Sequence, residues 1–312
     1  MQMGYDIPVM ERHGFQFKTR TGQRHILIDT QEIIEKRAKS MMNLDFGRGQ
    51  LNLRYLGEYF GLETQKGDLD YSILAKPFLQ GEELKQLKKY LEGDLDTTYE
   101  LFSYLYDFFS GFMEYMNPTD VQRFKWLTAS AGSTAYKIIC HQAGIPELYT
   151  DYNEAKRMKT VRYTGGCVSK PYKDYVEGDI YCIDFASLYP HMFMGGNLYS
   201  PVGMYGDIND AEEEGWEGGE IYGDTSDRVR GSYSKEPGKI EVAIKTLFLE
   251  RKEVKAQMRT LDKTSEEYKT LDRKQLAIKI VINTMYGISG SPKFKSVYNL
   301  TTASDCTAFR RS

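Results

Sequence analysis

Two helical patterns that follow each other directly constrain the fold of this chain more than any other feature. The first covers residues 239–271 and the second covers residues 272–286, with Gly287 as the expected end of the second helix. In both segments apolar residues recur at helical spacing among charged residues, which is typical of helices that bury one face. Because no long linker separates the two segments, the sequence predicts a helical hairpin.

Other parts of the chain also have helical patterns. Residues 82–116 are predicted to form two long helices that part near Gly93. Residues 132–144 are predicted to form a further helix, which its final glycine closes. Asp29 lies where a helix over residues 30–40 would need its cap.

Extended patterns alternate with these helices. Short strands are predicted at residues 25–29 and 179–185, which are short runs of mainly apolar residues. After Val161 the sequence becomes rich in glycine, proline and tyrosine, which indicates a domain boundary. The stretch 207–220 is acidic and rich in glycine, so it is expected to be a surface loop. Together these patterns predict a mixed α+β fold.

Net charge and cysteine spacing argue against several classes of protein. The formal net charge of −3 argues against a surface that binds nucleic acid over its whole extent. The four cysteines are far apart, so neither a zinc site nor a redox pair is indicated. The sequence has no apolar run long enough to span a membrane, and its first residues lack the pattern of a signal peptide. We therefore expect a cytoplasmic protein that is not secreted and has no membrane partner.

Polar residues of the predicted hairpin are spaced so that they share helix faces. Lys279, Asn283 and Tyr286 are four and three residues apart, and Arg251 and Lys255 are four apart. Arginine offers a planar set of donors and lysine a compact charge, and both suit phosphoryl oxygens. These side chains could converge on a polyanion, although charged helix faces are more often simply solvated.

Asp184 stands near the end of the second predicted strand, directly after Cys182 and Ile183. A buried carboxylate without a partner costs on the order of several kcal/mol, so it must meet a cation, hydrogen-bond donors or solvent. An aspartate at a strand end is more often a cap or turn residue. The surrounding sequence therefore has to decide its role.

Four sequence elements resemble motifs of family B DNA polymerases, the alpha-type DNA-directed DNA polymerases. DFASLYP at residues 184–190 resembles the first palm motif, DxxSLYP. KIVINTMYG at residues 279–287 resembles the second, KxxxNSxYG, with Thr284 in place of serine. LFLERKEVKAQM resembles the RxxxK element of the fingers, and YTGGCVSKP at residues 163–171 resembles the YxGG element that joins exonuclease to palm. All four stand in the family's order. The short fingers, with Arg251 and Lys279 close in sequence, and the YTGGCVSKP element resemble the archaeal and phage DNA-primed branch.

Two shorter elements resemble exonuclease motifs of the same family. YLEGD at residues 90–94 resembles the third motif, YxxxD. YDIPVMERH at residues 5–13 resembles the end of the second motif, whose asparagine is absent here. The resemblance implies a 3′-5′ proofreading exonuclease in which Asp6 and Asp94 bind metal and Tyr90 orients the attacking water.

The resemblance also implies template-directed DNA synthesis, in which the primer 3′-hydroxyl attacks the α-phosphate of a dNTP. Asp184 is the expected catalytic carboxylate and, with the backbone of Phe185, the expected ligand of two Mg²⁺ ions, for which Mn²⁺ could substitute. Lys279 is expected to be catalytic as well, and Tyr189 to reject ribonucleotides. The expected dNTP-binding residues are Phe185, Ser187, Leu188, Tyr189, Arg251, Lys255, Lys279 and Asn283. The expected DNA-binding residues are Tyr163, Gly165, Gly166, Tyr286 and Gly287.

The implied architecture is a partial RNase H-like exonuclease domain followed by a polymerase palm with an antiparallel sheet and by helical-hairpin fingers. The expected limits are 1–125 for the C-terminal part of the exonuclease domain, 126–162 for a helical connector, 163–238 for the N-terminal half of the palm, 239–287 for the fingers, and 288–312 for the start of the return to the palm.

The family needs elements that this sequence does not contain. The first exonuclease motif is expected before residue 1, and the second palm carboxylate and the thumb after residue 312. The nearest similar run, DTSD at residues 224–227, precedes the fingers. We therefore expect a fragment or one subunit of a split polymerase, inactive alone and with exposed apolar surface. The expected partners are primed DNA template, dNTPs, a C-terminal palm-and-thumb polypeptide and a sliding clamp, at a prokaryotic or viral replication fork.

Two interpretations from other classes stay open. A non-catalytic DNA-binding or scaffold remnant would grip nucleic acid through the basic face of the hairpin, with salt-dependent DNA affinity and no dNTP binding. A helical structural protein with incidental motif matches would bind no nucleotide.

Overall fold

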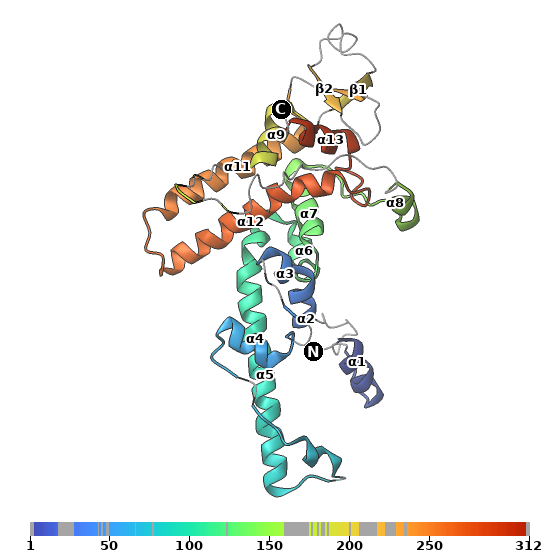
Figure 1. The fold of residues 1–312 in the computed structure, drawn as a ribbon. Helices are drawn as coiled ribbons and strands as arrows, with labels where there is room; N and C mark the ends of the chain where they lie inside the picture. The colour runs from blue at the N-terminus through green and yellow to red at the C-terminus, as the bar shows by residue number, and fades with distance from the viewer. Residues whose placement is uncertain are drawn as a thin grey trace. The chain divides into compact units, whose positions relative to one another are not determined.

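The computed structural model divides the chain into two compact units, drawn in Figure 1. Residues Met1–Met113 and Pro118–Ser130 form the first unit, and Glu114–Asn117 and Ala131–Ser312 form the second. The structure describes residues 3–17, 28–42, 44, 46–47, 50–65, 67–76, 78–122, 124–158, 175, 177–179, 181, 185, 187–199, 201–205, 217–221, 229–233 and 236–309. None of the helices in these ranges has the length and apolar character that a membrane span requires.

Helix α5 (Gly81–Phe109) runs through the first unit as one continuous helix. The prediction of two helices that part near Gly93 is wrong. A glycine inside a helix costs only about 1 kcal/mol relative to alanine. The burial of Leu101, Leu105 and Phe109 anchors the C-terminal half of α5. Tertiary packing therefore outweighs the local signal of the glycine.

Helix α4 (Leu53–Phe60) packs against α5. The side-chain oxygen of Asn52 caps α4 by accepting a hydrogen bond from Tyr55 N at 3.0 Å. The helix ends at Gly61, whose φ of 63° suits glycine in the left-handed region. Glu100 of α5 then holds the following loop, because its carboxylate accepts a hydrogen bond from Thr64 N at 2.8 Å.

The predicted helix over residues 30–40 is present as three successive pieces. Asp29 caps it as predicted, since Asp29 Oδ1 accepts hydrogen bonds from the backbone N of Gln31 and Glu32 at 2.9 and 3.4 Å. The pieces are α2 (Thr30–Ile33), the π-helical turn η1 (Ile34–Ala38) and α3 (Lys39–Met41). The strand predicted at 25–29 falls largely outside the described residues. The other short helices are α1 (Met3–Arg12), η2 (Tyr71–Ala75), η3 (Ser110–Tyr115), α6 (Pro118–Gln122) and η4 (Lys125–Leu127).

A buried arginine lies in the core of the first unit. The guanidinium carbon of Arg37 is 4.5 Å from the ring centre of Phe109, 4.7 Å from that of Phe112 and 5.4 Å from that of Trp126. Arg37 also donates a hydrogen bond to the backbone oxygen of Trp126. Burial lowers the pKa of Arg37 to about 9, because the charged form loses hydration. The aromatic faces and the carbonyl replace part of that hydration.

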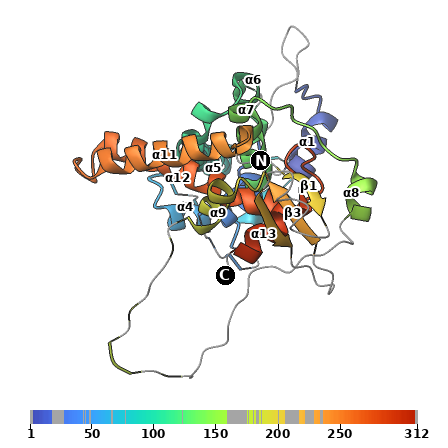
Figure 2. The ribbon, with the colours of Figure 1, turned by 90° about the horizontal axis from the view of Figure 1, so that it is seen from above.

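Helices α11 (Lys239–Met258) and α12 (Glu266–Ser289) form the predicted hairpin of the second unit, and they run side by side in Figures 1 and 2. The predicted junction at residues 271–272 is wrong, because the chain turns at residues 259–265. Asp262 Oδ1 accepts a hydrogen bond from Thr264 N at 2.8 Å, and Ser265 caps α12 by accepting one from Tyr268 N at 3.1 Å. These local bonds set the turn earlier than the apolar pattern indicated.

Helix α7 (Ala131–Ala143) packs against both helices of the hairpin and confirms the helix predicted at 132–144. Gly132 lies at this packing surface, and a Cβ there would make ordinary contacts with the side chain of Ile288 at 3.5 Å and with the ring of Phe294 at 3.6 Å. Side chains of all three helices are fully buried between them, among them Ile138, Ile139, Ile244, Ile278 and Ile282. This three-helix core supports the hairpin.

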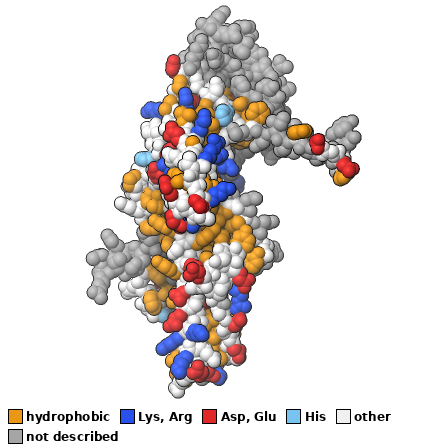
Figure 3. Space-filling view, turned by 90° about the vertical axis from the view of Figure 1, so that its left-hand side faces the viewer, with side chains coloured by type: hydrophobic (Ala, Val, Ile, Leu, Met, Phe, Trp, Pro, Cys, Tyr) orange, Lys and Arg blue, Asp and Glu red, His pale blue; other side chains and the backbone are white. Residues whose placement is uncertain are grey.

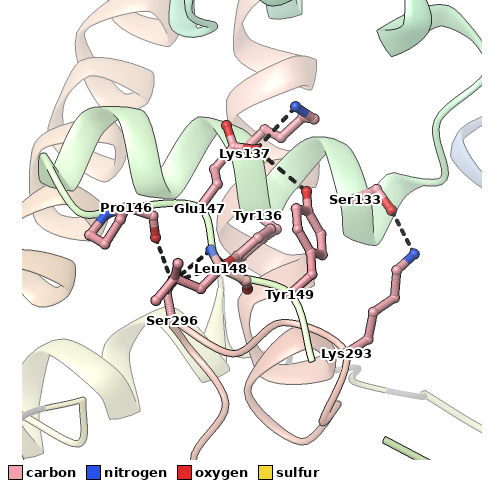
Figure 4. Close-up of polar contacts among 9 residues, drawn as sticks. All are labelled: Ser133, Tyr136, Lys137, Pro146, Glu147, Leu148, Tyr149, Lys293 and Ser296. Carbon is pink, nitrogen blue, oxygen red and sulfur yellow. Dashed lines mark hydrogen bonds and ion pairs between the residues drawn. The ribbon is translucent and has the colours of Figure 1, made fainter. Parts of the chain in front are cut away.

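The segment after α7 is tied to the segment after α12, as Figure 4 shows. Tyr149 and Phe294 form an antiparallel bridge between the two segments. The Tyr136 hydroxyl donates a hydrogen bond to Leu148 O at 2.6 Å and accepts one from Leu148 N at 2.8 Å. Ser296 Oγ also accepts a hydrogen bond from Leu148 N, at 3.1 Å. The base of the hairpin is thereby joined to the end of α7.

A small antiparallel sheet completes the second unit together with three further helices. Strands β1 (Pro201–Tyr205), β2 (Glu217–Ile221) and β3 (Val229–Tyr233) lie in the order β1-β3-β2. Helix α13 (Leu300–Phe309) lies against β2 and against α9 (Leu188–Gly196), whereas α8 is a short helix at Tyr152–Met158. The described residues are mainly helical, and both the α+β class and the domain limits stay predictions.

Two sequence predictions concern this region. Residues 217–220, predicted as part of a loop, are paired with β3 instead, so that part of the prediction is wrong. Residues 207–216 lie outside the described part of the chain, as do residues 180 and 182–184 of the strand predicted at 179–185. The described residues 179, 181 and 185 belong to no strand.

Gly93→Ala should stabilise the chain by about 0.5–1 kcal/mol, because alanine is the better helix former. The added Cβ would meet only ordinary contacts, the nearest being Gln65 O at 3.8 Å. Gly61→Ala is the matched control and should destabilise by about 1–2 kcal/mol, because its φ is positive. Urea unfolding followed by circular dichroism measures both. A loss of stability in Gly93→Ala would contradict the continuous helix.

Candidate nucleotide-binding site

Two tyrosines from distant parts of the sequence stack on each other in the second unit. The ring centres of Tyr189, on α9, and Tyr286, on α12, are 4.2 Å apart, with an angle of 10° between the ring planes. The Tyr286 hydroxyl lies 2.9 Å from Thr307 Oγ1, and Thr307 Oγ1 donates its own proton to Ala303 O at 3.0 Å. Tyr286 is therefore the donor to Thr307. The stack joins the DFASLYP and KIVINTMYG segments in one place.

Helix α9 is held against both hairpin helices. The rings of His191 and Phe248, on α11, meet edge to face at 4.8 Å. Tyr199, just after α9, donates a hydrogen bond to Met285 O of α12 at 3.0 Å. Pro190 lies in the first turn of α9, where a helix needs no backbone donor. Ser187, which precedes the helix, has a φ of 57°, a left-handed conformation that is uncommon for serine.

A second set of contacts connects the two hairpin helices at Arg251. Arg251 Nε lies 3.3 Å from both the backbone oxygen and Oε1 of Gln275, and Arg251 Nη2 lies 3.2 Å from the same Oε1. Burial lowers the pKa of Arg251, which is half-buried. The guanidinium is thus held along the surface of α12.

The surface of α12 next to Arg251 carries the other predicted phosphate ligands. Gln275, Lys279, Asn283 and Tyr286 are four, four and three residues apart, so they line one face of the helix. Each step of four residues advances about 6 Å along the helix axis. Lys279 and Asn283 are exposed. The face therefore leads from the arginine, past an exposed cation and an exposed amide, to the tyrosine stack.

Two predicted residues differ from the others in position. Lys255 is exposed on α11, one turn nearer the tip of the hairpin than Arg251. Gly287 is exposed beside Tyr286, and a Cβ added there would meet no atom within 4 Å. Space is therefore open in the direction of a side chain at Gly287.

A polar cluster also connects α11 and α12, at the level of the Arg251–Gln275 contact but on another side of the helices. Lys274 Nζ lies 2.9 Å from Glu250 Oε1 and 2.9 Å from Glu114 Oε1, and the Tyr115 hydroxyl donates to Glu250 Oε1 at 2.8 Å. Burial alone would lower the pKa of Lys274, but the hydrogen bonds to the two glutamates raise it on balance. Residues 250–251 and 274–275 therefore supply two adjacent cross-links between α11 and α12.

Charges of both signs cover the tip of the hairpin, which faces the viewer in Figure 3. Its exposed basic residues include Lys252, Lys255, Arg259, Lys263 and Lys269. Exposed acidic residues stand between them in the sequence, among them Glu253, Asp262, Glu266 and Glu267. This mixture is typical of a solvated helix surface rather than of a continuous basic patch.

The remaining predicted residues of this site differ in how far the structure describes them. Four of them lie outside the described residues: Asp184, Tyr163, Gly165 and Gly166. Phe185 is 74% exposed, while Ser187 and Leu188 are half-buried at the start of α9. The described residues contain no group of three or more histidine, cysteine, aspartate or glutamate side chains that could hold a metal ion. The metal-site residues stay predictions.

The predicted exonuclease residues belong to the first unit. Tyr90 and Asp94 lie one turn apart on α5, and the Tyr90 hydroxyl is 3.0 Å from that of Tyr71. Asp6 is part of α1, and its side chain lies outside the described atoms. Their roles also stay predictions.

Sequence reasoning missed Gln275, Thr307, Glu250 and Lys274. A signal for Gln275 was present, since it stands one turn before Lys279 on the same helix face. Thr307 has no such signal, because its contact with Tyr286 depends on the return of α13.

Comparison with known proteins identifies the family. Residues 133–312 match the family model described as DNA polymerase family B. The chain therefore belongs to DNA polymerase family B, as its motifs predicted. A DNA polymerase 2 of Aeropyrum pernix is 32% identical over 229 residues, which cover 72% of this chain and 26% of that protein. A DNA polymerase of Thermococcus gorgonarius is 29% identical over 229 residues, which cover 70% of this chain and 27% of that protein.

A solved structure has a similar fold. The family B DNA polymerase from the hyperthermophilic archaeon Pyrobaculum calidifontis aligns with a TM-score of 0.55 and 20% identity. The alignment covers 83% of this chain and 33% of that structure. The chain thus spans between about a quarter and a third of the length of these relatives.

Lys274→Met should destabilise the second unit by about 1–3 kcal/mol, because the partly buried Glu250 and the more exposed Glu114 would lose their shared cation. Lys252→Met, on the exposed surface of α11, is the control and should change stability by less than about 0.5 kcal/mol. Thermal unfolding measures both. Equal effects of the two substitutions would contradict a structural role for the cluster.

Asp305 is a buried residue of α13, and Asp305→Asn should flatten the dependence of the free energy of unfolding on pH. Burial raises the pKa of Asp305 to about 8, above the ordinary 3.8. Between these values the folded chain holds a proton that the unfolded chain has lost, so stability falls as pH rises from about 4 to 8. The free energy of unfolding of the variant, relative to that of the wild type, should be higher at pH 7.5 than at pH 5. Urea unfolding at both pH values measures this difference. An unchanged difference would contradict the raised pKa.

Proposed function

We propose that this chain carries the nucleotide-binding part of a template-directed DNA polymerase, which transfers nucleotides from dNTPs to a primer 3′-hydroxyl. The observation that carries the proposal is the stack of Tyr189 on Tyr286, at one end of the helix face that bears Lys279 and Asn283. The three-stranded antiparallel sheet beside α13 is consistent with a palm, and the α11–α12 hairpin with fingers.

Each residue of this face has a proposed role. Arg251 and Lys279 hold the triphosphate, because a guanidinium and an ammonium suit phosphoryl oxygens. Lys279 also stabilises the charge that develops during transfer, which makes it catalytic. Asn283 donates a further hydrogen bond, and Lys255 contributes charge from the side of the hairpin tip.

The tyrosines act on the sugar and base. Tyr189 lies under the sugar and leaves no room for a 2′-hydroxyl, which excludes ribonucleotides. Tyr286 and the open space at Gly287 border the new base pair. Phe185, Ser187 and Leu188 surround the triphosphate at the start of α9. Further contacts to DNA come from Tyr163, Gly165 and Gly166.

The proposed function includes a divalent metal ion, because two oxygen atoms of this chain are suitable ligands for one. The Asp184 carboxylate and the Phe185 carbonyl oxygen are hard ligands of the kind that Mg²⁺ or Mn²⁺ prefers. A bound ion would neutralise charge on the reacting phosphate. The proposed partners are primed DNA, dNTPs and a sliding clamp. The remaining parts of the polymerase belong to the same or to a separate polypeptide. The proposed place of action is the cytoplasm.

Proofreading is a second proposed function, favoured by the placement of Tyr90 and Asp94 one turn apart on α5. Asp94 and Asp6 would bind metal, and Tyr90 would orient water.

Binding of a fluorescent dATP analogue to the whole chain in Mg²⁺ tests the main proposal. Lys279→Met should weaken binding about tenfold or more, because a charge-assisted hydrogen bond contributes on the order of 1.5–3 kcal/mol. Lys252→Met should leave binding unchanged. Primer extension with an added palm-and-thumb polypeptide of an archaeal relative, with Asp184→Ala as control, then tests synthesis.

Salt-dependent DNA binding without nucleotide binding would instead support a non-catalytic DNA-binding remnant. Absence of both would overturn the proposal in favour of a structural protein.

A further inference from the structure

We propose that Gln275 is a positioning residue that presents one edge of the Arg251 guanidinium to a triphosphate; this rests on the proposed function. Gln275 lies outside the sequence motifs, and it is half-buried between the hairpin helices. It faces Arg251 with two acceptors, its side-chain Oε1 and its backbone oxygen.

The contacts with Gln275 occupy one side of the guanidinium. A guanidinium has a side edge, formed by Nε and one terminal nitrogen, and an end edge, formed by the two terminal nitrogens. Gln275 Oε1 accepts from both nitrogens of the side edge of Arg251, at 3.3 and 3.2 Å. Among the described residues, nothing accepts a hydrogen bond from Nη1. The end edge therefore stays available for two phosphoryl oxygens.

Asp272 fixes which way the Gln275 amide points. Gln275 Nε2 donates to Asp272 Oδ1 at 2.9 Å, so its oxygen must face the arginine. A flipped amide would direct its NH₂ group at a guanidinium and its oxygen at a carboxylate, and both contacts would be repulsive. Arg251 thus donates to the Gln275 amide, and the Gln275 amide donates to Asp272.

The adjacent cross-link holds the spacing of the two helices. Lys274 precedes Gln275, and Glu250 precedes Arg251, so the Lys274–Glu250 ion pair lies at the same level. Successive residues of a helix point about 100° apart, so the two cross-links occupy different sides of α12. Rotation of α12 that broke one contact would also strain the other.

Positioning matters because a free arginine side chain has many rotamers. Ordering this side chain costs conformational entropy, which the binding of a ligand must otherwise offset. Because Gln275 already holds the guanidinium, part of this entropy is lost before the nucleotide binds. Lys279, one turn further along the same face, would then contact the same triphosphate from a fixed direction.

A double-mutant cycle tests the inference with the whole chain, using Mg²⁺-dATP and inorganic tripolyphosphate as probes. Gln275→Met, which keeps the length and removes both polar atoms of the amide, should weaken dATP binding about threefold to tenfold. The weakening should be similar for tripolyphosphate, which has no base or sugar. In an Arg251→Met background, Gln275→Met should cause no further loss. Gln257→Met, exposed on α11, is the matched control and should change nothing.

Asp272→Ala provides a second variant if Gln275→Met fails to fold. It leaves Gln275 in place and releases its amide, so a smaller loss in the same direction is expected, again only when Arg251 is present. The inference is overturned if Gln275→Met weakens binding equally with and without Arg251, or does not weaken it at all, while Lys279→Met still weakens binding. If the wild-type chain binds neither probe, the proposed function fails, and this inference fails with it.

Discussion

The antiparallel pairing of α11 and α12 is the constraint on which the rest of the second unit depends. Its apolar side is buried against α7, and Ile244, Ile278 and Ile282 are fully buried there. Its polar side is fixed by two contacts at one level, Arg251 with Gln275 and Lys274 with Glu250. Because helix geometry is rigid, fixing α12 at this level also fixes the positions of the residues further along its face.

Partly buried polar contacts hold this arrangement more firmly than exposed ion pairs. Lys85–Glu82 is largely exposed, and a pair of this kind contributes only about 0.2–0.5 kcal/mol. The Lys274 cluster is less exposed, with 23% of the lysine side chain accessible, and it involves two carboxylates and a tyrosine hydroxyl. Removing one partner there leaves charge behind in a less polar place, which costs more than the pair itself contributes.

Membership of DNA polymerase family B gives these contacts a context, but the chain spans only part of its relatives. Helix α5 exposes Leu91, Leu95 and Tyr99, which are large side chains usually kept from water. The exposed apolar surface expected from the sequence concerns the incomplete palm, and that expectation stays a prediction. In the second unit, by contrast, α7, α9 and α13 pack closely on the hairpin.

The sequence by itself determined the family and several of the local elements. Asp29 and the 132–144 helix were predictable because capping and periodicity depend on residues a few positions apart. The hairpin was predictable for the same reason, although its turn depended on side-chain bonds of Asp262 and Ser265 that the apolar pattern does not contain. The motifs identified Tyr189, Arg251, Lys279 and Tyr286 one by one.

Only the tertiary structure decided which of these residues meet. The stack of Tyr189 on Tyr286 joins positions far apart in the sequence, and the Thr307 contact needs the chain to return after α12. The choice of Gln275 as the partner of Arg251 follows from the relative register of two helices, which no spacing within one helix determines. The continuity of α5 through Gly93 has a similar origin, because the burial of distant apolar side chains outweighed a local cost of about 1 kcal/mol.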